Sequence, residues 1–204
     1  MLLRERGLYL LFTPNLCAGD PWHTLAAALA AGVDLVQWRD PAGRHDGFDR
    51  CLDLCRAAAV PLIVNDDVEL AIRSDTAGAH VGQDDLAAGA ARRLLGARLL
   101  GVSTHDAGQI RRALADGADY LGFGPCYATA TKGYASGQPA ADIAAAVKQA
   151  GAVPVFAIGG ITPTNLPQLL GLGIERIAVS SAILASDDPA ATTAEFRRLL
   201  DPLR

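Results

Sequence analysis

Eight short apolar runs recur along this chain, and most of them are apolar throughout. Continuous apolar runs are typical of strands covered on both faces, as in a parallel sheet wrapped by helices, whereas half-exposed strands alternate apolar with polar residues. The runs therefore predict a parallel sheet. Its expected strands comprise residues 8–12, 34–39, 61–65, 79–82, 99–103, 120–125, 153–159 and 176–180.

Segments with helix-forming, amphipathic composition fill most of the gaps between these runs. They comprise residues 22–31, 48–59, 87–95, 109–115, 140–150, 163–170 and 189–200, and the connection 67–76 is the shortest. Several helices are expected to end in a left-handed glycine just before the next strand, as at Gly32, Gly117 and Gly173. The alternation predicts an α/β fold, a single (β/α)8 TIM barrel over residues 1–204. A doubly wound open sheet is disfavoured because eight alternating strands close and leave no edge.

Composition and charge argue against nucleic acids and membranes as partners of this protein. Aromatic residues make up 5% of the 204 residues and the net charge is -4, with no basic run, so we expect no nucleic acid partner. The apolar run 8–12 is too short for a signal core or a membrane span, which predicts a cytoplasmic protein without a membrane partner. The four cysteines are expected to be reduced thiols. Cys51 and Cys55, one helical turn apart, are interpreted as packing residues in preference to soft-metal ligands.

Polar residues follow several of the strands, as on the catalytic face of a parallel barrel. Asp66 follows the third strand and Asp85 the fourth, so the fold is expected to bring both carboxylates within reach of one cation. Mg²⁺ is the natural candidate because it prefers oxygen ligands and often binds one or two carboxylates plus substrate phosphate. The alternative is that these aspartates are helix N-caps, the role expected for Asp67 and Asp84.

Small residues follow the last two strands. Gly159-Gly160 and Ser180-Ser181 occupy positions where barrels often bind phosphate through backbone N–H groups. A tight turn that needs glycine is the alternative, but it would have to explain both loops at once. Together with the acidic strand ends, these loops predict an enzyme that acts on phosphorylated small molecules.

Three further groups are candidates for binding an anion. Thr129, Thr131 and Lys132 follow the sixth strand and offer two hydroxyls and a cation for a carboxylate or diphosphate. Gln37 and Arg39 lie two residues apart and share one face, expected to be the barrel interior. Pairing of the Arg39 side chain with Asp40 or Asp66 is an open alternative. His105 is interpreted as part of a helix start, capped by Ser103 or Thr104, and is left out of the catalytic set.

Seven ordered motifs at strand ends carry a resemblance that runs nearly end to end. They are VQWRD (36–40), LIVND (62–66), HVGQDD (80–85), GVSTH (101–105), YLGFGP with TATK (120–125 and 129–132), FAIGGIT (156–162) and VSSAI (179–183). In these motifs the chain resembles the thiamine phosphate synthases, barrels that join a pyrimidine diphosphate to a thiazole phosphate. The resemblance implies a dissociative reaction, in which diphosphate leaves and the thiazole nitrogen captures a pyrimidine cation. It further implies a homodimer.

The resemblance also implies roles for individual residues. The aminopyrimidine diphosphate would be held by Gln37, Arg39, Asn65, Ser103 and Lys132, of which Arg39, Ser103 and Lys132 would be the catalytic residues. Its magnesium would be bound by Asp66 and Asp85. The thiazole phosphate would be held by Thr129, Thr131, Gly160, Ser180 and Ser181.

The chain departs from the family pattern at three places. Pro41 replaces the lysine of the usual Gln-x-Arg-x-Lys motif, Pro14 replaces an acidic residue, and Gly133-Tyr134 stands where an aspartate is common. Two other functions stay open beside the synthase. One is the related thiazole tautomerase, which usually has a histidine where this chain has Pro125. The other is a barrel that binds thiazole phosphate without catalysis.

Overall fold

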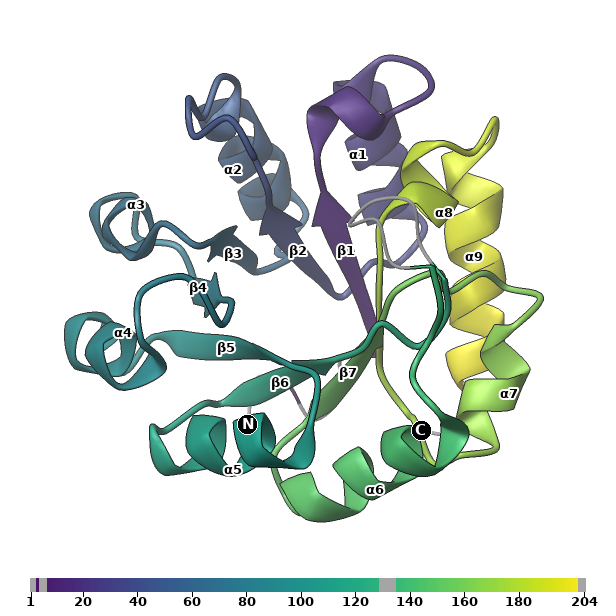
Figure 1. The fold of residues 1–204 in the computed structure, drawn as a ribbon. Coiled ribbons are helices and arrows are strands. Elements are labelled where there is room, and N and C mark those ends of the chain that lie inside the picture. The colour runs from purple at the N-terminus through teal and green to yellow at the C-terminus, as the bar shows by residue number, and fades with distance from the viewer. Residues whose placement is uncertain (1–2, 4–6, 129–134, 202–204) are drawn as a thin grey trace.

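The computed structural model describes residues 3, 7–128 and 135–201, and these form a closed parallel barrel (Figure 1). The strands follow one another around the ring in chain order, and β1 pairs with both β2 and β8 to close it. They are β1 (Leu8–Phe12), β2 (Leu35–Trp38), β3 (Leu62–Asn65), β4 (Gly78–Val81), β5 (Leu99–Thr104), β6 (Tyr120–Phe123), β7 (Val155–Ile158) and β8 (Ile177–Val179). The predicted (β/α)8 barrel is confirmed.

Helices surround the barrel as an outer ring, and the last helix lies beside the first (Figure 1). They are α1 (Pro21–Ala30), α2 (Phe48–Ala57), α3 (Val68–Arg73), α4 (Ala88–Leu95), α5 (Ala107–Ala115), α6 (Ala140–Ala150), α7 (Leu166–Leu170), α8 (Ser181–Leu184) and α9 (Pro189–Leu200), with a 3-10 turn η1 (Pro14–Leu16). The short elements η1 and α8 were not predicted as helices, because runs of three or four residues carry too little periodicity to reveal them. For α3 the sequence predicted only a helix start at Asp67.

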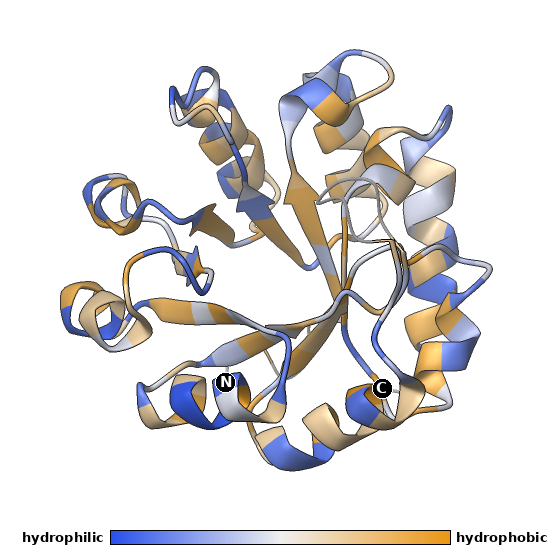
Figure 2. Cartoon of the chain, viewed as in Figure 1, coloured by the Kyte–Doolittle hydropathy of each residue, from blue (hydrophilic) through white to orange (hydrophobic). Residues whose placement is uncertain are grey.

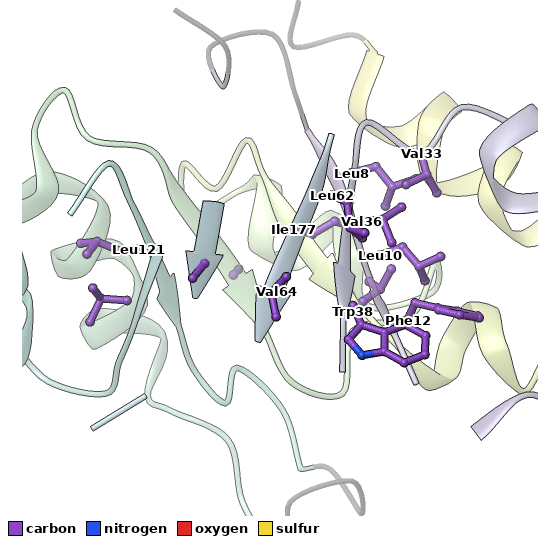
Figure 3. Close-up of a cluster of buried hydrophobic side chains, with 14 of the residues drawn as sticks. Leu8, Leu10, Phe12, Val33, Val36, Trp38, Leu62, Val64, Leu121 and Ile177 are labelled. Carbon is purple, nitrogen blue, oxygen red and sulfur yellow. The ribbon is translucent and has the colours of Figure 1, made fainter. Parts of the chain in front are cut away.

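The largest core lies between the outer face of the barrel and the helices. Figure 2 shows the apolar strands at the centre and polar residues along the outward parts of the helices. Along β1, Leu8, Leu10 and Phe12 point outward into this core, and Figure 3 shows them near Val36 and Trp38 of β2. The rings of Phe12 and Trp38 lie 6.1 Å apart. Burial of such large side chains supplies most of the stabilisation of the barrel wall.

A second, smaller cluster fills the inside of the barrel. It contains the alternate residues of the same strands, including Tyr9, Leu11, Ile63, Tyr120 and Phe156. Successive side chains of a strand point to opposite faces, so one apolar run supplies both cores. Inside the barrel, the buried polar side chains of Gln37 and His80 lie among these aromatic rings.

The glycines expected at the ends of helices share one backbone conformation. Gly32, Gly117 and Gly173 all have positive φ, at 105°, 84° and 86°, as predicted for glycines that close helices. Two of these glycines, Gly32 and Gly117, are followed two residues later by an aspartate that bonds to the preceding strand. Asp34 accepts from the backbone N–H of Leu8 at 2.9 Å, and Asp119 accepts from that of Leu100 at 2.8 Å.

The cysteines are free thiols, as predicted. Cys51 and Cys55 lie in the outer core on the buried face of α2 and pack there, in agreement with their interpretation as packing residues. Among the described residues, none of the helices has the length and hydropathy needed to cross a membrane.

Candidate functional site

Two adjoining cavities lie at the carboxyl ends of the strands. The larger has a volume of about 380 Å³ and is lined mainly by residues that follow β6, β7 and β8. The smaller has a volume of about 70 Å³ and extends into the barrel interior, where residues of all eight strands line it. Arg39 and Ser103 line both cavities. A ligand in one cavity would therefore meet a ligand in the other along a wall that carries a cation and a hydroxyl.

The smaller cavity brings together five of the predicted site residues with Arg39. These are Gln37, Asn65, Asp66, Asp85 and Ser103. They come from the ends of four different strands, or from the loops directly after them. Parallel pairing of these neighbouring strands brings such distant segments of the chain around one space.

Asp66 and Asp85 are each anchored by hydrogen bonds. Asp66 has a left-handed backbone, with φ of 64°, and its N–H donates to the His80 carbonyl at 2.8 Å. Its carboxylate also accepts from the Asn65 side-chain amide. The Asp85 carboxylate accepts from the backbone N–H of Gly82 at 2.8 Å. A Cβ on residue 82 would lie 2.8 Å from that carboxylate oxygen, so glycine makes room for the acid.

This donor set suits a hard cation. Both carboxylates line the small cavity, and neither is a helix N-cap, since the caps of α3 and α4 are Asp67 and Ala87. Among the described residues there is no group of three or more histidine, cysteine, aspartate or glutamate side chains that could hold a metal. Two carboxylates match the preference of Mg²⁺, which keeps several waters and adds substrate phosphate.

Arg39 is a partly buried cation between the two cavities. Burial lowers its pKa, whereas Asp66, Tyr9 and Asp85 act in the opposite direction through their negative or potentially negative charge. The suggested pairing of Arg39 with Asp40 is wrong. The Asp40 carboxylate instead accepts from backbone N–H groups of its own loop, including that of His45 at 2.7 Å. Burial acts to raise the pKa of Asp40, but these hydrogen bonds together with the nearby His45 lower it below its ordinary value.

The wall of the larger cavity is rich in glycine and serine. Gly159, Gly160, Ser180 and Ser181 all line it, as the two-loop prediction requires. Gly159 and Gly160 have φ of 99° and 63°, and a Cβ on Gly160 would overlap the carbonyl oxygen of Ala128. Asn165 closes this loop, because its side-chain amide donates to the Gly160 carbonyl at 2.9 Å.

Three predicted residues cannot be placed in this way. Thr129, Thr131 and Lys132 lie outside the described residues. The described segment before them ends at Ala128, which lines the larger cavity. Their predicted roles stay predictions.

Two predictions about helix starts are wrong. Neither Ser103 nor Thr104 caps α5; the N-cap is Asp106, whose carboxylate accepts from the N–H of Gln109 at 2.8 Å. His105 instead lines the larger cavity, with its Nδ1 bonded to the Gly124 carbonyl oxygen. Asp84 does not cap α4, which begins four residues later, whereas Asp67 does cap α3 as expected. Short loops before these helices move the caps away from the strand ends.

Sequence reasoning missed three side chains inside the smaller cavity. Tyr9, His80 and Tyr120 line it, and each is at most 7% exposed. The sequence contained a signal for them. Each is a polar side chain at an inward-facing position of an otherwise apolar strand, the kind of position predicted for Gln37. A polar group at such a position needs a buried partner, so it points to a network.

Comparison with known proteins identifies the family. A model of the thiamine monophosphate synthase family matches residues 8–183. The chain belongs to this family. A thiamine-phosphate synthase of Chloroflexus aurantiacus is 43% identical over 180 residues, which cover 86% of this chain and 83% of that protein. One from Bacillus velezensis is 37% identical over 198 residues, covering 93% and 88% of the two chains.

A solved structure of this synthase family has the same fold. It is thiamine phosphate pyrophosphorylase from Pyrococcus furiosus, with a TM-score of 0.85 and 25% sequence identity. The similarity covers 97% of this chain and 96% of that one. The resemblance drawn from the seven motifs is thereby confirmed at the level of the family.

Proposed function

We propose that the protein is a thiamine-phosphate synthase. It condenses 4-amino-2-methyl-5-(diphosphooxymethyl)pyrimidine with 4-methyl-5-(2-phosphooxyethyl)thiazole and releases diphosphate. The observation that carries this proposal is the pair of adjoining cavities, one with carboxylates and one with glycine and serine loops, which share Arg39 and Ser103. Two phosphorylated substrates that must react with each other need such a common wall.

The smaller cavity would hold the diphosphate end of the pyrimidine substrate. Gln37 and Asn65 offer amide groups to the ring, and Arg39 and Ser103 face the diphosphate, with Lys132 as a further cation from the β6 loop. Asp66 and Asp85 would hold Mg²⁺, which supplies positive charge for the diphosphate oxygens.

The larger cavity would hold the thiazole phosphate. The backbone N–H groups near Gly160 and Ser181, and the Ser180 and Ser181 hydroxyls, are the available donors. Thr129 and Thr131 would complete the contacts from the β6 loop. This arrangement directs the thiazole ring toward Arg39 and Ser103.

The reaction needs no nucleophilic side chain. The bond between the pyrimidine methylene carbon and the diphosphate oxygen breaks, and its electron pair leaves with the diphosphate. The thiazole nitrogen then donates its lone pair to the methylene cation and forms the new C–N bond. Arg39, Ser103 and Lys132 act by stabilising negative charge on the leaving group, while the walls align the substrates and exclude water.

The test is an assay for thiamine phosphate from the two substrates, with Mg²⁺ and with a chelator. We expect product that requires Mg²⁺ and that falls at least about 100-fold in Asp66→Ala, since that variant loses charge stabilisation of the leaving group. Asp84→Ala is the matched control: it removes a neighbouring exposed carboxylate that lines neither cavity. Product formation that is equal with chelator and with Mg²⁺ would contradict the proposed metal role.

The alternative functions predict other outcomes. A thiazole tautomerase would isomerise the thiazole phosphate without using the pyrimidine diphosphate, and a binding protein would retain thiazole phosphate without any product. The placement of Asp66 and Asp85 around one cavity favours the synthase, because neither alternative uses a metal and diphosphate site. The expected homodimer and cytoplasmic location stay predictions, and the first is checked by light scattering of the purified chain.

A further inference from the structure

A chain of hydrogen bonds crosses the barrel interior and ends at Ser103. Ser103 Oγ lies 2.9 Å from His80 Nε2, and His80 Nδ1 lies 3.2 Å from the Tyr120 hydroxyl. That hydroxyl lies 2.9 Å from the hydroxyl of Tyr9, which accepts from Gln37 Nε2 at 2.9 Å. The chain therefore links two residues of the cavity wall, Gln37 and Ser103, through side chains of β1, β4 and β6.

The number of protons available determines which group is the donor in each of these hydrogen bonds. Burial raises the pKa of Tyr9 and Tyr120, so each hydroxyl retains one proton to donate. The Tyr9 oxygen accepts from Gln37, and within the described part of the chain its remaining side-chain hydrogen bond is to Tyr120. The Tyr9 proton therefore goes to the Tyr120 oxygen. The opposite direction would leave a buried hydroxyl proton without an acceptor, which folded proteins rarely tolerate.

The same reasoning assigns donor and acceptor in the hydrogen bonds from Tyr120 to His80 and from His80 to Ser103. Tyr120, which accepts from Tyr9, donates its own proton to His80 Nδ1. A neutral imidazole that accepts at Nδ1 carries its proton on Nε2, and this proton is donated to Ser103 Oγ. Because the serine oxygen already accepts from His80, its own proton is available for another acceptor. Ser103 lines both cavities, so that acceptor would be a bound ligand.

We propose that Tyr9, Tyr120 and His80 are positioning residues that hold Ser103 as a hydrogen-bond donor toward an oxygen of the bound substrate. This inference rests on the proposed function, in which that oxygen belongs to the diphosphate. The Gln37 amide sets the direction of these hydrogen bonds, although it lies on β2 and Ser103 lies on β5. The backbone of His80 has a second role, because its carbonyl accepts from the N–H of Asp66 at 2.8 Å.

The direct test is the tautomer of His80 in the protein without ligand. Two-bond ¹H–¹⁵N NMR correlations of uniformly ¹⁵N-labelled protein distinguish protonation at Nε2 from protonation at Nδ1. A His80→Gln sample identifies which of the four histidine signals belongs to residue 80. We expect a neutral ring protonated at Nε2. A ring protonated at Nδ1, or at both nitrogens, would overturn the proposed direction.

A substitution at the far end of the chain tests the coupling. In Gln37→Glu the carboxylate accepts from Tyr9, so each hydrogen bond reverses and His80 becomes protonated at Nδ1. Tyr120→Phe removes the partner of Nδ1, and we expect a mixture of both tautomers. Thr193→Val is the control, since it removes a buried hydroxyl in α9 that is bonded at 2.7 Å to the Pro189 carbonyl, and it should leave the His80 signals unchanged. An unchanged tautomer in Gln37→Glu would rule out control by Gln37.

A double-mutant cycle on turnover tests whether Tyr120 acts through Ser103. We expect kcat to fall about 100-fold in Ser103→Ala and about 10-fold in Tyr120→Phe, as for loss or misalignment of one donor to developing charge. The double variant should match Ser103→Ala, because the serine proton is then already lost. Effects that multiply would overturn the proposal, even if thermal unfolding shows that every variant is folded.

The two proposals fail in different ways. Absence of thiamine phosphate from the wild-type assay would refute the synthase, while the tautomer in the wild type and in Gln37→Glu would still decide the direction of the chain. Product formation together with Nδ1 protonation would refute the directed chain and leave the synthase intact.

Discussion

The two cavities are adjacent but are built in different ways. The smaller is formed by side chains, namely carboxylates, amides, an arginine and a buried hydrogen-bond chain. The larger includes the glycine and serine loops after β7 and β8, where Gly159 and Gly160 have conformations that other residues rarely adopt and Ser180 is the N-cap of the short helix α8. The first should therefore be sensitive to loss of charge, and the second to any added atom. Substitutions that follow this distinction test it directly.

Arg39 should give the largest effect because it belongs to both cavities. We expect Arg39→Met to lower kcat by about 100- to 1,000-fold and to raise KM for both substrates, since a partly buried charge aimed at the leaving group is lost. Steady-state kinetics with each substrate varied in turn measures this. Arg44→Met removes an exposed arginine of the same loop as a control. An effect on only one KM would show that the cavities do not share this cation.

Gly160 should separate the two cavities. A Cβ at this left-handed position would overlap the Ala128 carbonyl oxygen, so Gly160→Ala has to displace the loop wall. We expect KM for the thiazole phosphate to rise about 10-fold, the loss that roughly 1.4 kcal/mol of strain would cause, with little change in KM for the pyrimidine diphosphate. Gly151→Ala is the matched control, because it has a similar φ but its Cβ would meet no atom within 4 Å. Equal changes in both KM values would contradict the assignment.

Pro41 should affect the smaller cavity alone. Pro41 stands where the family has a lysine, so we expect Arg39, Lys132 and Mg²⁺ to suffice for activity with weaker diphosphate affinity. Pro41→Lys should then lower KM for the pyrimidine diphosphate about 2- to 5-fold, the gain expected of one exposed charge. The effect should shrink with added salt because an exposed charge is screened. KM for the thiazole phosphate is the internal control. No change in apparent binding of the diphosphate substrate would refute this interpretation of Pro41.

The smallest effect should come from Cys126, a residue of the β6 loop that is 3% exposed. Burial raises the pKa of its thiol to about 12, while a backbone hydrogen bond acts weakly in the other direction. The thiolate fraction at pH 8 is then about 10⁻⁴, so iodoacetamide should leave Cys126 unmodified and activity unchanged. Any slow modification should accelerate about tenfold per pH unit up to pH 9. Peptide mapping measures this, and rapid labelling would mean that Cys126 opens to the larger cavity.

Much of the fold was predictable because its signals are local. Continuous apolar runs, glycines such as Gly32 and Gly117, and the helix-forming segments between them each reflect preferences of a few neighbouring residues. The ends of the strands were predictable for the same reason, so Asp66, Asp85, Gly160 and Ser180 could be assigned to one face of a barrel. The caps of α4 and α5 were wrong because a displacement of two or three residues leaves almost no trace in composition.

Other features depend on contacts between distant segments. The register of the strands and the distances between inward-facing side chains decide which polar groups inside the barrel bond to one another. No local pattern therefore predicts the bond of Tyr9 to Tyr120 or of His80 to Ser103. The sequence by itself determined the barrel, the face that carries both cavities and the residue types there, since these follow from periodicity and turn chemistry. Tertiary structure alone decided that Arg39 and Ser103 form the wall between two cavities, because that arrangement exists only once the first and last strands pair.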